Sequence, residues 1–586
     1  MSLDSAQSQQ RMAPIPITGG MTQVMGREWM VASGHPLANQ AAARILTAGG
    51  NAVDAGVAAG FMLGVVHPDM VSFAGVAPIL VHVAQTRETF EVSGVGPYPR
   101  KASAEFFRTR CGGEIPVGVL RTVVPASPDA WCTALERWGT LRFADVIAPS
   151  LECAERGFPL SRFSASIIGA NVERYQRFPT SAALYLPNGR PLEPGQRLVQ
   201  TELAQTIKLM IEAEARVTGR VAGIHAARDA FYQGEIARRI ARFHAQEGGL
   251  LAEEDLAAFQ VEVAPALTTR FGDHEVAACG FWCQGPVLLQ MLNLLEAFDL
   301  RGMGHNSPQA LHTMVEAMKL AFADREVYYG DPHHVKVPAE GLLSKAYAEA
   351  RRALIREDRA WPDMPPPGDP DARAPVRHGG VMTAALGGLS PASLDTAYVA
   401  VVDAAGNGFS ATPSDPSVDS PVVPGVGCVV SPRGSQGWLT PGHASEVAPG
   451  KRPRLTPAPA MVLRDRRLLM PFGTPGGDVQ QQAMLQVLVN IVSYGMLPQA
   501  AVEMPRVATR SFPDSFWPHT HSPGRLDAER SLAPETRASL AALGHGISDC
   551  PEWDWRAGAV CAVLVGADDV RLAGADPRRG SHAVGW

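Results

Sequence analysis

Apolar residues recur along the chain at two spacings, one typical of helices and one of strands. Leu37, Ala41 and Ile45 form an apolar stripe at helical spacing, and a pair of glycines follows it. Proline is favoured in a first helical turn, so the stripe predicts a helix from Pro36. A second helix is expected to begin after Asn51.

Longer apolar stretches predict buried elements. The run 52–66 contains Asp54 and is shorter than the roughly 20 residues that span a bilayer, so it predicts a buried helix. The region 201–324 is mostly helical in pattern. The elements expected in the remainder of the chain are helices over 203–211, 226–243 and 484–491, and a strand over 558–565.

A β-branched apolar run and a shorter second run predict a hairpin. Residues 397–402 are followed by a Gly-Asn turn and then by 408–412, with Thr396 at the mouth. A threonine in this position is usually only a β-former, and its hydroxyl is a poor nucleophile. If the chain is cut between Asp395 and Thr396, the new α-amino group, with a pKa of about 7.7–8, serves as general base for the Oγ of the same residue.

The residues around this hairpin resemble those of a known family. Precursors of the gamma-glutamyltransferase family of N-terminal-nucleophile hydrolases cut themselves before a threonine that heads such a pattern. The matching positions are Thr396, Val401, Val402, Asp403, Gly406 and Asn407. The resemblance extends from about 31 to 578 and is strongest over 31–55, 315–338, 396–407 and 449–492.

The resemblance implies an α+β fold, a four-layer αββα sandwich made as one precursor. The precursor is cut into a large segment, 1–395, and a small segment, 396–586, which remain one folded unit. Residues from about 356 to 392 are rich in Pro, Gly and Asp, which predicts a mobile linker. Such a linker lets the new chain end swing away from the nucleophile.

The same resemblance implies roles for residues beyond the nucleophile. The Ser414 hydroxyl supports it, and the backbone N–H groups of Gly476 and Gly477, which precede an apolar helix, form the oxyanion hole. The loop around Arg433 stands where the family has an acid for the substrate α-ammonium group, and arginine instead suits an anion. The expected substrate-binding residues are Arg433, Ser435, Gln436 and Thr456.

Four positions depart from the family's pattern for γ-glutamyl recognition: Val95, Pro416, Gln436 and Leu455. Val95 replaces an arginine whose bidentate contact with a carboxylate a valine cannot make, and Arg100 or Arg121 is an alternative source. We therefore predict a self-processing amidohydrolase or acylase that hydrolyses a small carboxylated amide through an acyl-enzyme. The runner-up is a gamma-glutamyltransferase or glutathione hydrolase, and a second alternative is an uncleaved, non-catalytic homologue.

Several motifs have a structural explanation beside the functional one. His35 and Asp54 suggest a catalytic pair, but hydrogen bonding at helix ends is the favoured interpretation. The His333-His334 pair suggests a metal, but no carboxylate or histidine at helical spacing accompanies it, so a solvated loop is favoured. The aromatic loop 511–519 either walls a pocket or packs into the core, with packing preferred. Arg433 is otherwise a salt-bridge residue of its loop.

The composition is that of a globular protein without a nucleic-acid or membrane partner. The chain has 586 residues, 46% hydrophobic and 19% charged, with a formal net charge of −6. Its eight cysteines include no Cys-x-x-Cys pair, so neither zinc nor a disulfide framework is expected, and we expect no metal or other cofactor. Residues 1–20 lack the pattern of a secretory signal, which predicts a cytoplasmic protein. Homodimer formation is left open.

Overall fold

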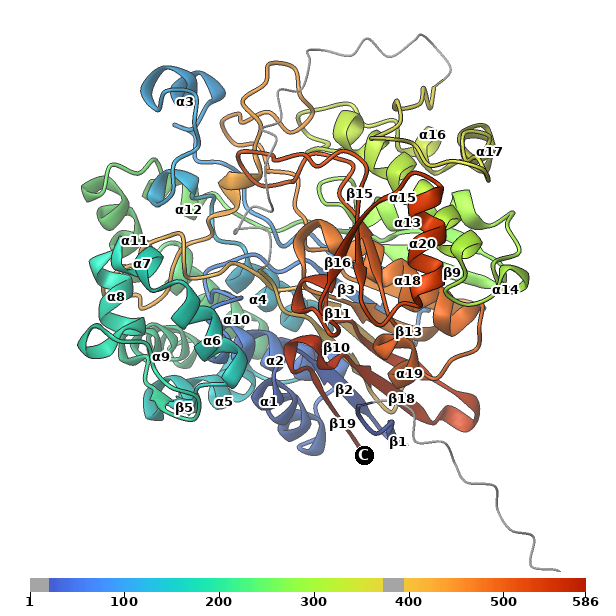
Figure 1. The fold of residues 1–586 in the computed structure, drawn as a ribbon. Coiled ribbons are helices and arrows are strands. Elements are labelled where there is room, and N and C mark those ends of the chain that lie inside the picture. The colour runs from blue at the N-terminus through green and yellow to red at the C-terminus, as the bar shows by residue number, and fades with distance from the viewer. Residues whose placement is uncertain (1–19, 372–394) are drawn as a thin grey trace, which may run out of the picture.

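Two seven-stranded antiparallel sheets pack face to face in this computed structural model, which describes residues 20–371 and 395–586 (Figure 1). The first sheet has the order β1 (Val24–Gly26), β18 (Arg571–Ala575), β17 (Cys561–Val565), β13 (Arg467–Gly473), β12 (Ala460–Arg464), β9 (His274–Ala278) and β8 (Leu267–Phe271). The second has the order β19 (His582–Gly585), β2 (Met30–Ser33), β10 (Val399–Val402), β11 (Gly408–Ala411), β3 (Ile79–Val83), β4 (Glu88–Val92) and β7 (Val263–Pro265). Buried apolar side chains of both sheets fill the space between them.

The predicted hairpin is confirmed and lies in the middle of the second sheet. β10 pairs with β11 along its whole length, and β2 and β3 flank the pair. Asp403 Oδ1 accepts from the Asn407 backbone N–H at 2.9 Å, and Gly406 takes a φ of +84° in the turn. Both strands are fully buried. The residue before β10, Thr396, is therefore attached to a rigid element of the fold.

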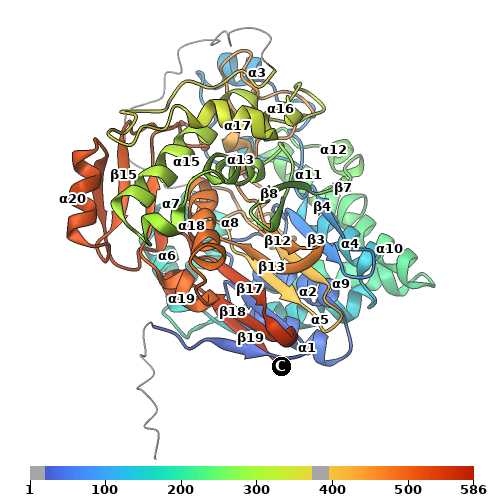
Figure 2. The same ribbon diagram turned by 90° about the vertical axis from the view of Figure 1, so that its right-hand side faces the viewer.

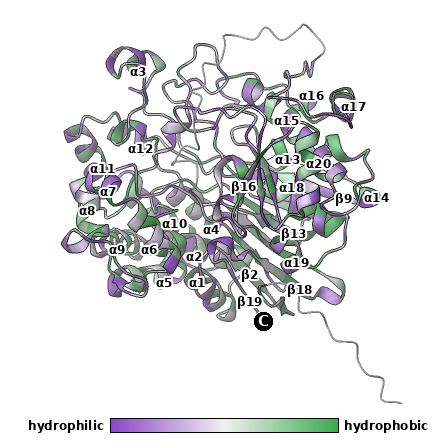
Figure 3. Cartoon of the chain, viewed as in Figure 1, coloured by the Kyte–Doolittle hydropathy of each residue, from purple (hydrophilic) through white to green (hydrophobic). Residues whose placement is uncertain are grey.

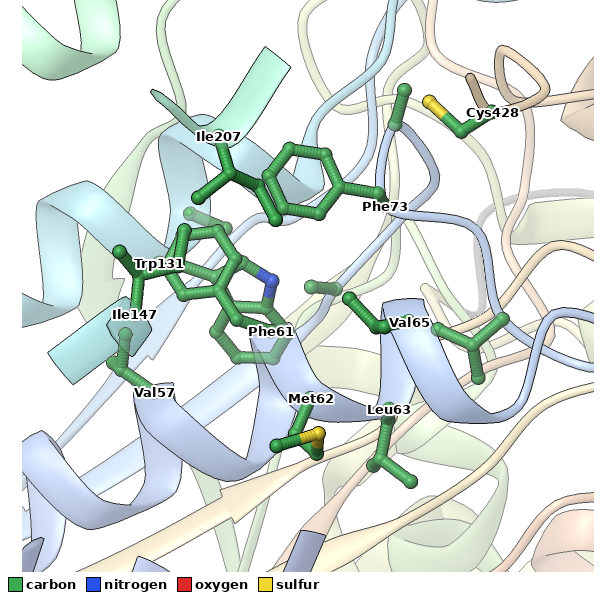
Figure 4. Close-up of a cluster of buried hydrophobic side chains, with 14 of the residues drawn as sticks. Val57, Phe61, Met62, Leu63, Val65, Phe73, Trp131, Ile147, Ile207 and Cys428 are labelled. Atoms are coloured by element: carbon green, nitrogen blue, oxygen red, sulfur yellow. The ribbon is translucent and has the colours of Figure 1, made fainter. Parts of the chain in front are cut away.

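The two predicted N-terminal helices are also confirmed, as α1 (Pro36–Thr47) and α2 (Ala52–Val66), and α2 packs on β10 and β11. Asn51 and Asp54 form a capping box at the start of α2. Glycine allows the close approach to the sheet, because a Cβ atom at Gly56 would lie 2.1 Å from the Phe409 ring. The other side of α2 meets apolar side chains of neighbouring segments, among them Phe73, Trp131, Ile147 and Ile207 (Figure 4).

In the described part of the chain, ten further helices follow α2 in sequence, and α4 and α5 contact it directly. The ten are α3 (Ala104–Arg110), α4 (Ser127–Trp138), α5 (Phe143–Arg156), α6 (Arg162–Ala170), α7 (Val172–Gln176), α8 (Pro179–Tyr185), α9 (Thr201–Ala215), α10 (Arg220–Tyr232), α11 (Glu235–Gln246) and α12 (Glu253–Ala257). The single helix predicted over 226–243 is wrong, since α10 and α11 are separate. A Cβ atom at Gly234, which lies between them, would come within 2.6 Å of the Ala230 carbonyl oxygen.

Another group of helices covers the first sheet. It comprises α13 (Gly285–Leu295), α14 (Leu300–Met303), α15 (Pro308–Tyr328), α16 (Ala339–Leu343), α17 (Lys345–Arg352), α18 (Gln480–Val492), α19 (Pro498–Glu503) and α20 (Pro534–Ala542). α13 and α18 contact the sheet, and α15 packs on the outside of α13 (Figure 2). The helix predicted over 484–491 is confirmed within α18. The strand predicted over 558–565 begins only at Cys561, because Gly558, with a φ of +84°, ends a preceding turn.

The first part of the predicted linker is irregular but anchored. The Trp361 backbone N–H donates to Glu316 Oε2 at 3.0 Å, and the Gly368 N–H donates to Asp324 Oδ1 at 3.0 Å. Trp361 and Gly368 therefore contact α15, and the mobility predicted for the linker stays a prediction. The remainder of the predicted linker, from 372, lies outside the described residues, as do residues 1–19 of the predicted N-terminal segment.

Two small sheets complete the structure, one of β14 (Val507–Thr509), β15 (Arg525–Glu529) and β16 (Gly546–Cys550), the other of β5 (Phe158–Pro159) and β6 (Arg197–Leu198). Polar and apolar residues alternate along the outer helices (Figure 3). Among the described residues, no helix is both long and apolar enough to cross a membrane.

Candidate active site

Thr396 lies directly before β10, with only 1% of its surface exposed. Its φ of +96° crowds a β-branched side chain against the backbone, and a conformation of this kind costs about 1–3 kcal/mol. The Thr396 N–H, which belongs to the bond predicted to be cut, donates to the Met70 carbonyl oxygen at 3.1 Å. The packed sheet therefore holds a strained backbone at the predicted cleavage position.

The hydroxyl of Ser414 lies 2.7 Å from Thr396 Oγ1, within hydrogen-bonding distance. Its backbone is fixed, because the Ser414 N–H donates to the Val76 carbonyl oxygen and the Ser72 N–H donates to the Ser414 carbonyl oxygen. This close approach needs Gly75, where a Cβ atom would lie 2.3 Å from the Ser414 carbonyl oxygen. The lack of a side chain at Gly75 thus allows the Ser414 backbone to lie close to this loop.

Arg433 contacts the groups around Thr396. It lies in the short helix η4, residues 433–436, and is 1% exposed. Its guanidinium donates to the carboxylates of Asp395 and Asp415, the second at 2.5 Å, and to the Ser414 hydroxyl. Asp395 also accepts from Thr396 Oγ1 at 3.0 Å. The arginine next to Thr396 therefore binds two acids of the protein itself.

These two acids lie in an environment that disfavours negative charge. Burial raises the pKa values of Asp395 and Asp415 above the ordinary range, while the positive charge of Arg433 acts in the opposite direction. Asp415 Oδ2 has no hydrogen-bond partner among the described residues, and the backbone φ of Asp415 is +100°. One guanidinium thus serves two buried carboxyl groups.

The other predicted substrate-binding residues lie near the same guanidinium. Thr456 Oγ1 accepts from Gln436 Nε2 at 2.9 Å and from Arg433 at 3.3 Å. The Ser435 hydroxyl instead donates to the Pro432 carbonyl oxygen at 3.0 Å. The structure therefore brings Thr456 and Gln436 into the Arg433 cluster, whereas the Ser435 hydroxyl closes a turn in its own loop.

Gly476 and Gly477 form a tight turn between β13 and α18. Their φ values of +127° and +55° favour glycine, and neither backbone N–H donates to a protein acceptor among the residues that the structure describes. The carbonyl oxygens of Gly477 and Thr456 both accept from Gln284 Nε2 at 2.9 Å. Gln284 thereby ties the glycine turn to the segment that carries Thr456.

Asp478 anchors the same turn to a second buried arginine. It accepts from Arg325 and from the backbone N–H and hydroxyl of Ser515, at 2.8 and 2.7 Å. Arg325 lies in α15 and also pairs with Glu326 at 2.6 Å. The family-like segment 315–338 thus supports the glycine turn from α15.

The aromatic loop 511–519 packs into the interior, as preferred, and one of its rings also lies beside Arg433. The Phe512 ring stacks on Phe322, with centroids 3.9 Å apart, in the apolar core. The Phe516 ring centre, by contrast, lies 5.3 Å from the Arg433 guanidinium carbon. Core packing at one end of the loop therefore accompanies an aromatic ring that lies beside the arginine at the other end.

Sequence reasoning missed Asp415, Gln284 and Phe516 as parts of this site. Asp415 directly follows the predicted catalytic hydroxyl of Ser414, and this adjacency was the available signal. Phe516 had a signal in the unassigned aromatic loop. Gln284 had none, because a single polar residue before an apolar helix is common.

The arginines considered as replacements at Val95 are engaged elsewhere. Arg121 is buried, donates to the Ile115 carbonyl oxygen and lies 3.8 Å from Asp419. Arg100 lies 3.9 Å from Asp255 at the surface. Of these three arginines, Arg433 is the one that contacts the groups around Thr396.

The histidine motifs have the structural roles that were favoured. His35 caps α1, where its Nδ1 accepts from the Leu37 N–H at 3.2 Å. Asp54 belongs to the cap of α2, and His333 lies 2.6 Å from Glu262 at the surface. These contacts account for the residues without a catalytic pair or a metal.

One group of described residues has the composition of a metal site, His312, Glu316 and His545, with ligand atoms within 4.8 Å of one another. The ammonium group of Lys319 lies 2.8 Å from Glu316 Oε1. The two imidazoles are within hydrogen-bonding distance, at 2.9 Å. Since a cation already faces the carboxylate, we assign no metal to this cluster.

The fold and the threonine at the head of β10 place the protein among the N-terminal-nucleophile enzymes, which hydrolyse amides or transfer their acyl groups. The family model described as Gamma-glutamyltranspeptidase matches residues 38–586. The chain belongs to this family, which confirms the resemblance inferred from the sequence.

The relatives include acylases and glutathione hydrolases. The chain is 34% identical over 561 residues to the Acylase ACY 1 proenzyme of Pseudomonas sp. (strain SE83), covering 92% of each. It is 31% identical over 567 residues to the Glutathione hydrolase-like YwrD proenzyme of Bacillus subtilis (strain 168), covering 96% of this chain and 99% of the relative. The solved cephalosporin acylase from Bacillus halodurans matches with a TM-score of 0.84 at 27% identity, covering 98% of each chain.

Proposed function

We propose that the protein is a self-processing N-terminal-threonine acylase or amidohydrolase that hydrolyses a small carboxylated amide through an acyl-enzyme. The observation that carries the proposal is the position of Arg433. Its guanidinium binds carboxylates and donates to Ser414, whose hydroxyl lies 2.7 Å from Thr396 Oγ1. A guanidinium in this position suits a substrate carboxylate close to the scissile amide. The names of two relatives, an acylase and a cephalosporin acylase, agree with this reaction.

The first reaction is the cut of the chain. Thr396 Oγ1 attacks the carbonyl carbon of Asp395, the peptide C–N bond breaks, and the nitrogen of Thr396 takes up the hydroxyl proton. Water then hydrolyses the ester. The strained backbone at Thr396 favours this step, because the cut releases the residue from the chain that constrains it.

In the cut enzyme, the α-amino group of Thr396 takes the proton of its own hydroxyl as the oxygen attacks the substrate carbonyl carbon. Ser414 holds the nucleophile by its hydrogen bond. The N–H groups of Gly476 and Gly477 stabilise the tetrahedral anion. The amine product leaves with the proton, and water then releases the acyl group as a carboxylic acid.

The two segments remain together after the cut. Residues 1–395 supply β1 to β9, and 396–586 supply β10 to β19, so both large sheets contain strands of each segment. Separation would break hydrogen-bonded ladders within both sheets. With helices on the outer face of each sheet, this arrangement supports the four-layer αββα sandwich.

The variant Thr396→Ala tests the nucleophile. We expect intact-mass spectrometry to find the wild type as two segments divided after Asp395, and the variant as one chain. Turnover of the variant should fall by at least about 10,000-fold, since both the nucleophile and the base are lost. Thr396→Ser, which keeps a hydroxyl and the same amine, is the matched control and should cut itself. An active wild type still joined across this bond would refute the proposal.

The same preparations separate the two enzyme candidates. Gamma-glutamyl transfer or glutathione hydrolysis is the second candidate, because a glutathione hydrolase of Bacillus subtilis (strain 168) is 30% identical over 575 residues. A γ-glutamyl anilide and anilides of short dicarboxylic acids are compared by kcat/KM. Faster turnover of the γ-glutamyl compound would transfer the assignment to the second candidate.

A further inference from the structure

The side chain of Asp395 occupies the anion-binding position of Arg433 in the uncut chain. Asp395 is 3% exposed, and its carboxylate accepts from Arg433 and from Thr396 Oγ1. It is also the residue whose carbonyl carbon the nucleophile attacks in the proposed cut. The first acyl group that Thr396 carries is therefore Asp395, with its carboxylate directed to Arg433.

The covalent structure of Asp395 fixes how many carbon atoms lie between its carbonyl carbon, which Thr396 attacks, and its carboxylate, which Arg433 binds. Two carbon atoms, Cα and Cβ, lie between its carbonyl carbon and its carboxylate carbon. A succinyl group has this skeleton, a malonyl group is one carbon shorter, and a glutaryl group is one carbon longer. We propose that the cut enzyme hydrolyses N-succinyl amides, and that Asp395 is an internal mimic of the succinyl group that blocks Arg433 until the cut. This inference rests on the proposed function and specifies its substrate class.

The two reactions then share one chemical course. In the cut, the bond from Thr396 Oγ1 to the Asp395 carbonyl carbon forms, the C–N bond breaks, and water releases the Asp395 carboxylate. In turnover, Thr396 Oγ1 forms the same ester with the succinyl carbonyl carbon. The amine of the substrate leaves with one proton, and water gives free succinate and restores the hydroxyl. No oxidant, reductant or other co-reactant is needed.

A second cation helps to balance the charge that the acyl group brings. Arg433 faces both Asp395 and Asp415. The positive charge of Arg579 also opposes the rise in the pKa of Asp395 that burial causes. A Cβ atom at Gly476 would lie 3.8 Å from Arg579 Nη2, so this arginine lies beside the predicted oxyanion turn. A substrate carboxylate that replaces Asp395 meets the same charges.

Binding of succinate tests the mimic without any turnover. Isothermal titration should show that the cut wild type binds succinate, and that uncut Thr396→Ala binds it at least about tenfold more weakly, because the tethered Asp395 competes at a high effective concentration. The double variant Thr396→Ala/Asp395→Ala should regain binding while remaining uncut. Arg530→Gln, a substitution at an exposed arginine, is the charge control and should bind like the wild type.

Equal binding of succinate by the cut wild type and the uncut Thr396→Ala, or no binding by either, would overturn the proposal that Asp395 mimics a succinyl group. So would a double variant that folds and still fails to bind.

A series of anilides tests the acyl length in the cut enzyme. The kcat/KM for succinyl anilide should exceed those for the malonyl and glutaryl compounds by at least about tenfold. It should exceed that for the neutral butyryl anilide by about 100-fold, since the contact with the guanidinium is lost. If the glutaryl compound leads the series, the inference fails while the amidohydrolase proposal stands. If no anilide is hydrolysed, the proposed function itself fails.

Discussion

Two buried arginines, Arg433 and Arg325, bind acids in a similar way but differ in the permanence of their partners. Arg325 has no exposed side-chain surface and pairs with Asp478 and Glu326, which lie in the glycine turn and in α15. Arg433 is equally buried, but one of its acids, Asp395, adjoins the bond that the proposed mechanism cuts.

The difference shows what a buried ion pair contributes in each place. Removing one partner of a buried pair leaves an uncompensated charge, which is why such pairs persist in a fold. At Arg325 this penalty stabilises the glycine turn in both the uncut and the cut protein. At Arg433, Asp415 remains as a partner when Asp395 leaves, so the loss is smaller and the vacated position can accept another carboxylate. A similar set of contacts therefore gives a support in one place and a binding site in the other.

The largest expected effect compares two isosteric substitutions in the uncut Thr396→Ala background. Asp478→Asn should lower the free energy of unfolding by about 3 kcal/mol, because Asp478 accepts from Arg325 and twice from Ser515. Asp395→Asn should change it by less than about 1 kcal/mol, since Arg433 keeps its other acid and a buried carboxyl with a raised pKa is replaced by a neutral group. Urea titrations of the three uncut proteins measure both values.

Equal losses for the two substitutions would break the comparison. Asp395 would then be as structural as Asp478, and its departure from Arg433 would cost the fold too much to leave an open binding site.

A second, smaller effect is a pH dependence of the free energy of unfolding. It arises from Asp514, which lies near the turn that Arg325 supports. Burial and the nearby negative charge of Asp478 raise the pKa of Asp514 to about 8. An aspartic acid of the unfolded chain loses its proton near pH 4, so the folded state binds more protons between about pH 4 and 8. The free energy of unfolding should therefore fall as the pH rises through this window.

Asp514→Asn removes the titrating group and keeps an oxygen that can accept from the Phe516 N–H, a bond of 2.8 Å. Between pH 6 and 8, urea titrations of the uncut protein should show a loss about 2 kcal/mol larger with Asp514 than with asparagine. Parallel pH profiles would show that Asp514 is ionised in the fold and that the arginine network tolerates its charge.

Local signals allowed much of the fold to be predicted. The apolar stripe from Leu37 and the continuous run 52–66 each correspond to one helix, because periodicity depends only on residues close in sequence. The helix predicted over 226–243 failed at Gly234, where a glycine interrupts the chain without interrupting the apolar pattern.

The sequence predicted most residues of the candidate site, but it did not predict which of them bind one another. Arg433 was expected to bind an anion, yet its acids lie 38 and 18 residues away in sequence, at Asp395 and Asp415. Their meeting depends on how the chain after β11 folds back across the nucleophile. No periodicity or spacing encodes that path. The departures at Val95 and Pro416 indicated only that the substrate contacts had changed.

The smallest expected effects come from replacing an aromatic ring beside each arginine. Arg433 lies 5.3 Å from the Phe516 ring centre, and Arg325 lies 5.1 Å from that of Phe512. A cation–π contact is worth about 0.5–2 kcal/mol, so Phe516→Leu should weaken succinate binding to the cut enzyme about threefold. Phe512→Leu should instead lower the free energy of unfolding by about 1–2 kcal/mol and leave succinate affinity unchanged, because its ring packs on Phe322 in the core.

The matched pair of leucine variants is informative because both rings belong to one loop. If Phe512→Leu also weakened succinate binding threefold, a change in the core would have reached Arg433 through that loop, and the two arginines would form one coupled network. If only Phe516→Leu affects binding, the loop transmits no such change. The Arg433 site, whose bound carboxylate changes after the proposed cut, then works independently of the permanent pairs of Arg325. An enzyme whose own Asp395 is the first group bound at its site needs that independence.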